Sequence, residues 1–86
     1  MQQRKVLNGI ELSTDGRTVW VNGSHGGMIG RFSPRGIDVH GADDVHCLDC
    51  RPAPKENPWR AFAESMLEHH HVHVLDSFQP NWCKNS

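Results

Sequence analysis

The sequence predicts a small α+β domain, in which an antiparallel β-meander of about four strands packs against one amphipathic helix and a short final strand follows. Three observations lead to this class. Short runs rich in β-branched and aromatic residues, separated by turn residues, fill the first half of the chain. A single segment with a helical apolar period lies in the second half. The length of 86 residues suits one small domain, taken as 1–86.

The expected strands are separated by recognisable turns. They cover residues 10–13, 17–22, 28–33 and 37–40. Asp15-Gly16 suits a hairpin turn, because glycine tolerates positive φ, and Pro34-Arg35-Gly36 suits a second turn. Gly30 inside the third run indicates either a bulge or a side chain that crosses over the glycine.

The second half contains the one expected helix, over 57–70. Asn57 can cap it, and Pro58 suits its first turn, where a missing N–H has no cost. The apolar stripe consists of Trp59, Phe62, Ala63, Met66, Leu67 and His70. We expect residues 41–56 to form a loop, because they have no periodicity, and 72–75 to form a short strand. The tail 76–86 is expected to be irregular, with Phe78 and Trp82 packing on the domain.

Composition and charge disfavour two classes of function. The net charge is −1 and the cations are scattered singly, whereas proteins that bind nucleic acid usually cluster them. No stretch has the length and apolarity of a membrane span, and the N-terminus lacks the apolar core of a signal peptide. We therefore expect a cytoplasmic protein, in which the three cysteines are thiols or metal ligands.

Cys47-Leu48-Asp49-Cys50 is the one local spacing typical of a metal site. Two thiols two residues apart can bind one ion, and His46 and His40 precede them as further candidates. One structural zinc ion on Cys47, Cys50, His46 and His40 would stabilise so small a domain. The alternative is that both cysteines are packed thiols without a cofactor. A redox role is disfavoured, because the prolines that follow cannot open a regular helix.

A further hypothesis concerns Asp38 and His40, which share one face of the fourth expected strand. A carboxylate beside an imidazole can hold a divalent metal or orient a base, so a metal-dependent hydrolase is conceivable, with the histidines at 69–73 nearby. An exposed polar strand face is the simpler explanation. The histidine cluster is likewise explained by a helix C-terminus that runs into a half-exposed strand.

The aromatic residues point to binding rather than catalysis. Trp59 and Phe62 are expected in the core. A domain of this size has room for few buried indoles, and tryptophan is enriched in binding hot spots. We therefore take Trp20, Trp82 and His25 as candidate contacts to a partner; His25 lies in the glycine-rich loop 23–27.

Several sequence words occur together in a way that resembles a family of small bacteriophage and prophage proteins. They are IGRF at 29–32, GIDVH at 36–40 and CLDC at 47–50, followed by a helix of the NPWRAFAESMLEHH type and a VHVL strand. The resemblance implies a soluble protein that acts in the cytoplasm of the bacterial host and blocks a host or defence protein, as anti-CRISPR proteins do.

Together these observations favour a non-catalytic interaction protein. The second hypothesis is a zinc-stapled domain that binds nucleic acid or regulates transcription, and the third is the metal-dependent hydrolase.

Overall fold

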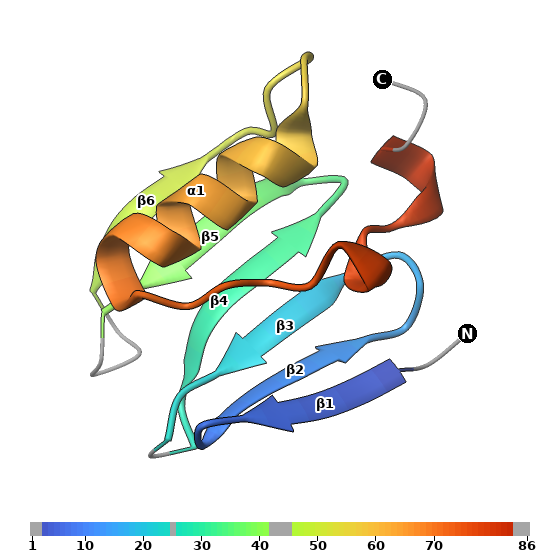
Figure 1. Cartoon of the computed structure of the whole chain (residues 1–86). Coiled ribbons are helices and arrows are strands. Elements are labelled where there is room, and N and C mark those ends of the chain that lie inside the picture. Colours follow the sequence, from blue (N-terminus) through green and yellow to red (C-terminus); the bar gives the residue numbers. More distant parts are fainter. Residues whose placement is uncertain (1–2, 25, 42–45, 84–86) are drawn as a thin grey trace.

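The computed structural model describes residues 3–24, 26–41 and 46–83. Six strands form one antiparallel sheet in which each strand pairs with the next along the chain, and one helix lies on one face of it (Figure 1). The strands are β1 (Gln3–Leu7), β2 (Ile10–Thr14), β3 (Val19–Asn22), β4 (Met28–Ser33), β5 (Gly36–His40) and β6 (Cys47–Arg51), and the helix is α1 (Pro58–His70). The α+β class, the antiparallel meander and the single helix are confirmed, and the sheet is larger than expected.

The two strands that sequence reasoning missed are the two edges of the sheet. β1 pairs with β2 through a turn at Asn8 and Gly9, whose φ angles are 52° and 81°. The expected loop 41–56 is wrong in its middle, because Cys47–Arg51 pairs with β5. Both strands are largely exposed, so neither shows the alternation that marks a half-buried strand.

β3 begins at Val19, two residues later than expected, because the preceding turn uses Arg17 and Thr18. The Asp15 carboxylate accepts hydrogen bonds from the backbone N–H groups of Arg17 at 2.9 Å and Thr18 at 2.8 Å. These bonds, the one from Thr18 foremost, hold the pKa of Asp15 below its usual value, because they stabilise the charged form. The turn is therefore fixed by the side chain of Asp15.

The ends of α1 differ from expectation in detail. Pro58 occupies the first turn as predicted. The predicted capping role of the Asn57 side chain is wrong: Asn57 takes a left-handed φ of 48°, its side chain makes no capping bond, and its carbonyl accepts the Ala61 N–H. At the other end His71 is left-handed, with a φ of 56°. Its N–H donates to the Leu67 carbonyl, which closes the helix.

The expected strand 72–75 is wrong. Within the described residues this segment pairs with no strand; it leaves α1 and crosses the same face of the sheet (Figure 1). Two short 3₁₀ turns follow, Asp76–Phe78 and Asn81–Cys83. Phe78 is buried and Trp82 packs on the core, so the tail attaches as predicted.

Phe32 is the centre of the core between sheet and helix. Its ring lies 5.3 Å from Trp59, 5.3 Å from Phe62 and 5.1 Å from Trp82, measured between ring centroids. Gly30 permits the close approach of α1, since a Cβ there would lie 2.5 Å from the Met66 sulfur. The crossing side chain that Gly30 indicated is thus Met66.

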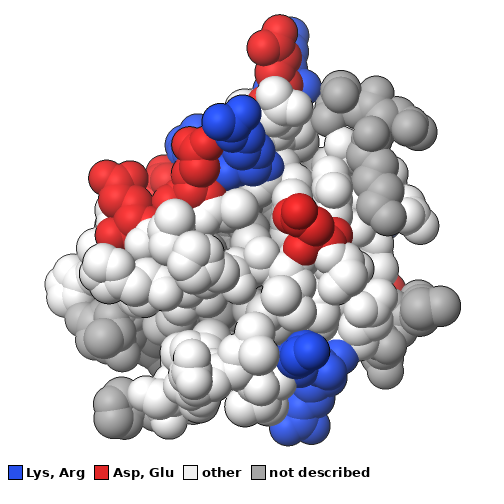
Figure 2. All heavy atoms as spheres, viewed as in Figure 1, with Lys and Arg blue, Asp and Glu red and all other residues white. Residues whose placement is uncertain are grey.

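The helix and the C-terminal segment cover the same face, so the other face of the sheet is left without a covering element among the described residues (Figure 1). Figure 2 shows the covered side, where charged groups gather along α1 and the middle is largely uncharged. No helix in the described part of the chain has the length and apolarity needed to cross a membrane.

Candidate functional site

One row of side chains crosses the uncovered face of the sheet. In β2 to β5 the buried residues that face α1 are mostly apolar, so their neighbours in sequence face outward. The strand registers then align one outward residue from every strand. In order across the sheet they are Arg4, Ser13, Trp20, Arg31, Asp38 and Cys50. We call this set the outer row.

Trp20 stands in the middle of the outer row and is only half-buried. A hollow of about 400 Å³ lies on its β2 side, where Arg4 and Asp15 are among the lining residues. A second hollow, of about 270 Å³, lies on its β4 side. Trp20 therefore lines a hollow on each side, and a partner's side chains can pack into such hollows.

The hollow on the β4 side is basic. Arg17, Arg31 and Arg35 line it together with Trp20. Arg31 is paired with Asp38, its Nη2 lying 2.8 Å from Asp38 Oδ2. The guanidinium groups of Arg17 and Arg35 make no ion pair or hydrogen bond within the described residues. Two arginines without an ion pair in the described part of the chain therefore line the same hollow as Trp20.

The helix side has a different charge pattern. Glu64 and Glu68 are exposed on α1, and Arg60 pairs with Glu64 at 2.8 Å. Figure 2 shows these acidic and basic groups side by side along the helix. The basic hollow beside Trp20 is thus on the opposite face from the acidic residues of α1.

A second cluster lies at the β6 end of the outer row. Asp38 is opposite Cys50, and His40 is opposite Cys47. An irregularity in the β5–β6 register leaves Leu48 as an extra residue, which brings Cys47 to the face that Cys50 occupies. One ligand atom from each of Asp38, His40 and Cys50 lies within 4.8 Å of the others. We call Asp38, His40, Cys47 and Cys50 the β5–β6 cluster.

The two cysteines are joined to each other in a disulfide, whereas the sequence led us to expect thiols or ligands. Cys83 is buried and takes no part in that disulfide, and its thiol donates to the Pro80 carbonyl at 3.2 Å. Of the four predicted metal ligands, the structure brings together His40, Cys47 and Cys50. His46 is exposed and lies outside the convergent group.

Asp49, between the two cysteines, faces α1. The Ser65 hydroxyl donates to its carboxylate at 2.7 Å, and Arg51 Nε donates to it at 2.9 Å. Partial burial raises the pKa of Asp49, but these hydrogen bonds and the charge of Arg51 outweigh it and hold the pKa below 3.8. The carboxylate is therefore charged at neutral pH and links β6 to the helix.

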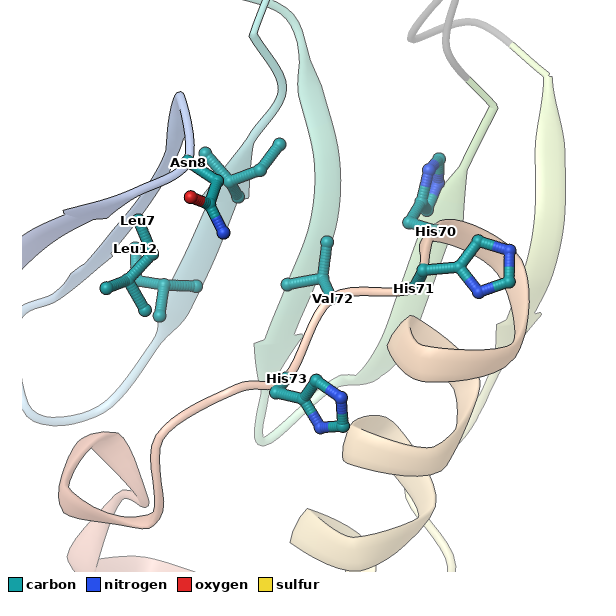
Figure 3. Close-up of a pocket in the computed structure, with 8 residues that line it drawn as sticks. Leu7, Asn8, Leu12, His70, His71, Val72 and His73 are labelled. Carbon is teal, nitrogen blue, oxygen red and sulfur yellow. The ribbon is translucent and has the colours of Figure 1, made fainter.

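The histidines at the end of α1 and just after it form no metal site in the described part of the chain. His70, His71 and His73 line a pocket of about 190 Å³ together with Leu7, Leu12 and Val72. Figure 3 shows Val72 projecting toward the strands that carry Leu7 and Leu12, while the three imidazoles lie nearer the helix and do not point at one centre. His70 Nε2 lies 2.5 Å from the backbone carbonyl of His40, to which it donates.

The remaining predicted partner contacts have different surroundings. Trp82 is 37% exposed, yet its ring stacks on Phe32 and its N–H donates to the Arg17 carbonyl at 2.7 Å. His25 lies outside the described residues. Sequence reasoning missed the arginines at 17 and 35, which belong to different turns and meet only through the folding of β3 and β4.

No protein-family model, no curated protein and no solved structure matches this chain significantly. The resemblance to small phage proteins and the cytoplasmic location remain predictions.

Proposed function

We propose that this protein is a non-catalytic binding module that uses the outer row to dock an acidic surface of a partner protein. The observation that carries the proposal is Trp20, half-buried at the centre of an uncovered sheet face between two hollows. Buried indoles at the centre of an interface commonly supply much of its binding energy.

The charge of the partner follows from the basic hollow. Arg17 and Arg35 have no internal carboxylate partner among the described residues, so a partner's carboxylates can pair with them. Arginine forms planar, bidentate contacts with carboxylates and stacks on aromatic rings, which suits a site beside an indole. Electrostatic complementarity of this kind speeds association and excludes basic partners.

The resemblance to phage proteins supplies the class of partner. On that basis we propose a bacterial host or defence protein whose functional site is blocked by steric occupation, in the bacterial cytoplasm.

The test is affinity capture from bacterial lysate treated with nuclease, using the tagged protein and matched variants. We expect one protein to be retained by the native chain and by Arg60→Glu, which changes an exposed residue on α1. Trp20→Ala and Arg35→Glu are expected to reduce its capture at least tenfold, which corresponds to about 1.4 kcal/mol. Circular dichroism of each variant establishes that the fold is retained.

The captured protein is then purified and its affinity measured at low and high salt. Weaker binding at high salt is expected, because ionic strength screens exposed ion pairs. Equal capture by all variants, or capture that nuclease abolishes, would contradict the proposal.

A further inference from the structure

We infer that the reduced protein binds one zinc ion across the last hairpin of the sheet, with Asp38 and His40 of β5 and Cys47 and Cys50 of β6 as its ligands. This inference does not rest on the proposed function, although Asp38 and Cys50 also belong to the outer row.

The first argument is strand register. Asp38 faces Cys50 and His40 faces Cys47 across the β5–β6 ladder. With strict alternation, Leu48 and not Cys47 would share a face with Cys50. The register shift at Val39/His40 brings Cys47 to that face instead. Four donors from two adjacent strands therefore meet on the outer face.

The second argument is distance. The ligand atoms of Asp38, His40 and Cys50 lie within 4.8 Å of one another, and the Cys47 sulfur is bonded to that of Cys50. Tetrahedral zinc with bonds of about 2.0–2.3 Å holds its ligands about 3.3–3.8 Å apart. The three ligand atoms therefore lie at most about 1.5 Å further apart than zinc requires.

The third argument is the chemistry of the donor set. Two thiolates, one imidazole and one carboxylate suit zinc, which accepts sulfur, nitrogen and oxygen in one tetrahedral site. Four protein ligands leave no position for a substrate, so the ion would have a structural role. Asp38 replaces His46 as the fourth ligand of the predicted set.

Two neighbouring contacts hold Asp38 and the end of β5 in place. Arg31 binds Asp38 through Oδ2 at 2.8 and 3.1 Å, which leaves Oδ1 for the metal. His70 holds the backbone carbonyl of His40 at 2.5 Å and so fixes the end of β5. A partner that orients a ligating carboxylate, as Arg31 does for Asp38, typically raises metal affinity 10–100-fold.

The sulfurs of Cys47 and Cys50 can form the disulfide or bind the metal, but they cannot do both at once. A phosphine reductant with one water converts the disulfide into two thiols and becomes the phosphine oxide. Zinc then replaces the two thiol protons, which are released. The residues of the edge strand β6 other than Asp49 are exposed. The metal would hold this strand against β5.

The experiment measures zinc and cobalt binding to the full chain after reduction by a phosphine and removal of metal. We expect one zinc per chain, and with Co²⁺ the visible absorption of a tetrahedral site together with thiolate-to-cobalt charge transfer. Cys50→Ser and His40→Ala are expected to weaken binding at least a hundredfold, and Asp38→Asn at least tenfold. His46→Ala and Cys83→Ser are the matched controls and should bind as the native chain does.

A second measurement does not depend on whether a variant folds. Zinc added to the reduced native protein should protect Cys47 and Cys50 from alkylation, as located by peptide mass spectrometry. Less than one zinc per chain, unprotected thiols at 47 and 50, or a loss of binding in His46→Ala equal to that in Asp38→Asn would overturn the inference.

Discussion

Asp49 is the residue that fastens the edge strand β6 to the helix. Its carboxylate accepts from Ser65 on α1 and from Arg51 on its own strand. Ser65 is itself buried, so removal of the carboxylate leaves its hydroxyl without this acceptor in a covered position. The contact is therefore worth more than an exposed ion pair.

We expect Asp49→Ala to lower the free energy of unfolding by about 1–2 kcal/mol, because a charged hydrogen bond to a buried hydroxyl is lost. Arg60→Ala is the matched control. It breaks the exposed Arg60–Glu64 pair and should cost less than about 0.5 kcal/mol. Urea unfolding at neutral pH measures both changes. Equal costs would show that Asp49 acts only as a surface charge.

The same carboxylate predicts a dependence on pH. The pKa of Asp49 is lower in the folded chain than its ordinary value of 3.8, so its contribution to stability is complete well above that value and is lost as the pH falls through the folded pKa. The stability difference between the native protein and Asp49→Asn should therefore narrow below about pH 4. Urea unfolding at pH 7 and pH 3 tests it, and a difference that widens at pH 3 would contradict it.

At the scale of the elements, Gly36 determines how closely β6 approaches the start of β5. It has a φ of 140°, and a Cβ there would lie 2.4 Å from the Arg51 carbonyl oxygen. That oxygen is backbone, which cannot rotate away. Gly26 also has a positive φ, of 89°, but an added Cβ would meet nothing within 4 Å.

These two glycines form a matched pair for mutation. Gly36→Ala is expected to cost about 3 kcal/mol or more, since backbone strain and steric overlap add. Gly26→Ala should cost about 1–2 kcal/mol from strain alone. The difference between the two costs in unfolding free energy measures the steric overlap of the added Gly36 Cβ with β6. A difference near zero would mean that β6 moves aside freely.

The elements that the sequence predicted are those with one buried face. β2 to β5 and α1 each have apolar residues at the strand or helix period, because each contributes to the core around Phe32. β1 and β6 pair with only one neighbour and are exposed, so burial does not impose a period on them. Asn8-Gly9 is nevertheless a strong hairpin signal, and it could have revealed β1.

The β5–β6 cluster shows where sequence reasoning about a site reaches its limit. The spacing of Cys47 and Cys50 identified two of its members, and alternation placed Asp38 and His40 on one face. Which residues meet across the hairpin depends on register, and here a single irregularity decides it. Asp38 was therefore assigned only to a hydrolase hypothesis, and His46 was preferred for the metal because it lies next to Cys47.

At the scale of the whole molecule, the C-terminal segment holds the two halves of the covered face together. α1 covers the β4–β5 side, and the segment after it covers the β2–β3 side. Trp59 donates to Asp76 at 3.2 Å, and Trp82 donates to the Arg17 carbonyl in the β2–β3 turn. The segment thus links the helix to the far part of the sheet, and Trp82 makes its contact with the β2–β3 turn.

Trp82→Ala should lower the free energy of unfolding by about 2–3 kcal/mol, less than for a fully buried tryptophan, because the side chain is partly exposed. Trp82→Phe keeps one ring on Phe32 but loses the N–H donor and part of the ring area, so its cost should be smaller, about 1 kcal/mol. Hydrogen exchange distinguishes this linking role from a simple loss of contact. If the segment links the two halves, Trp82→Ala should speed exchange at β2 and β3 more than at β5, whereas equal acceleration throughout the sheet would show that the tail only adds area to one core.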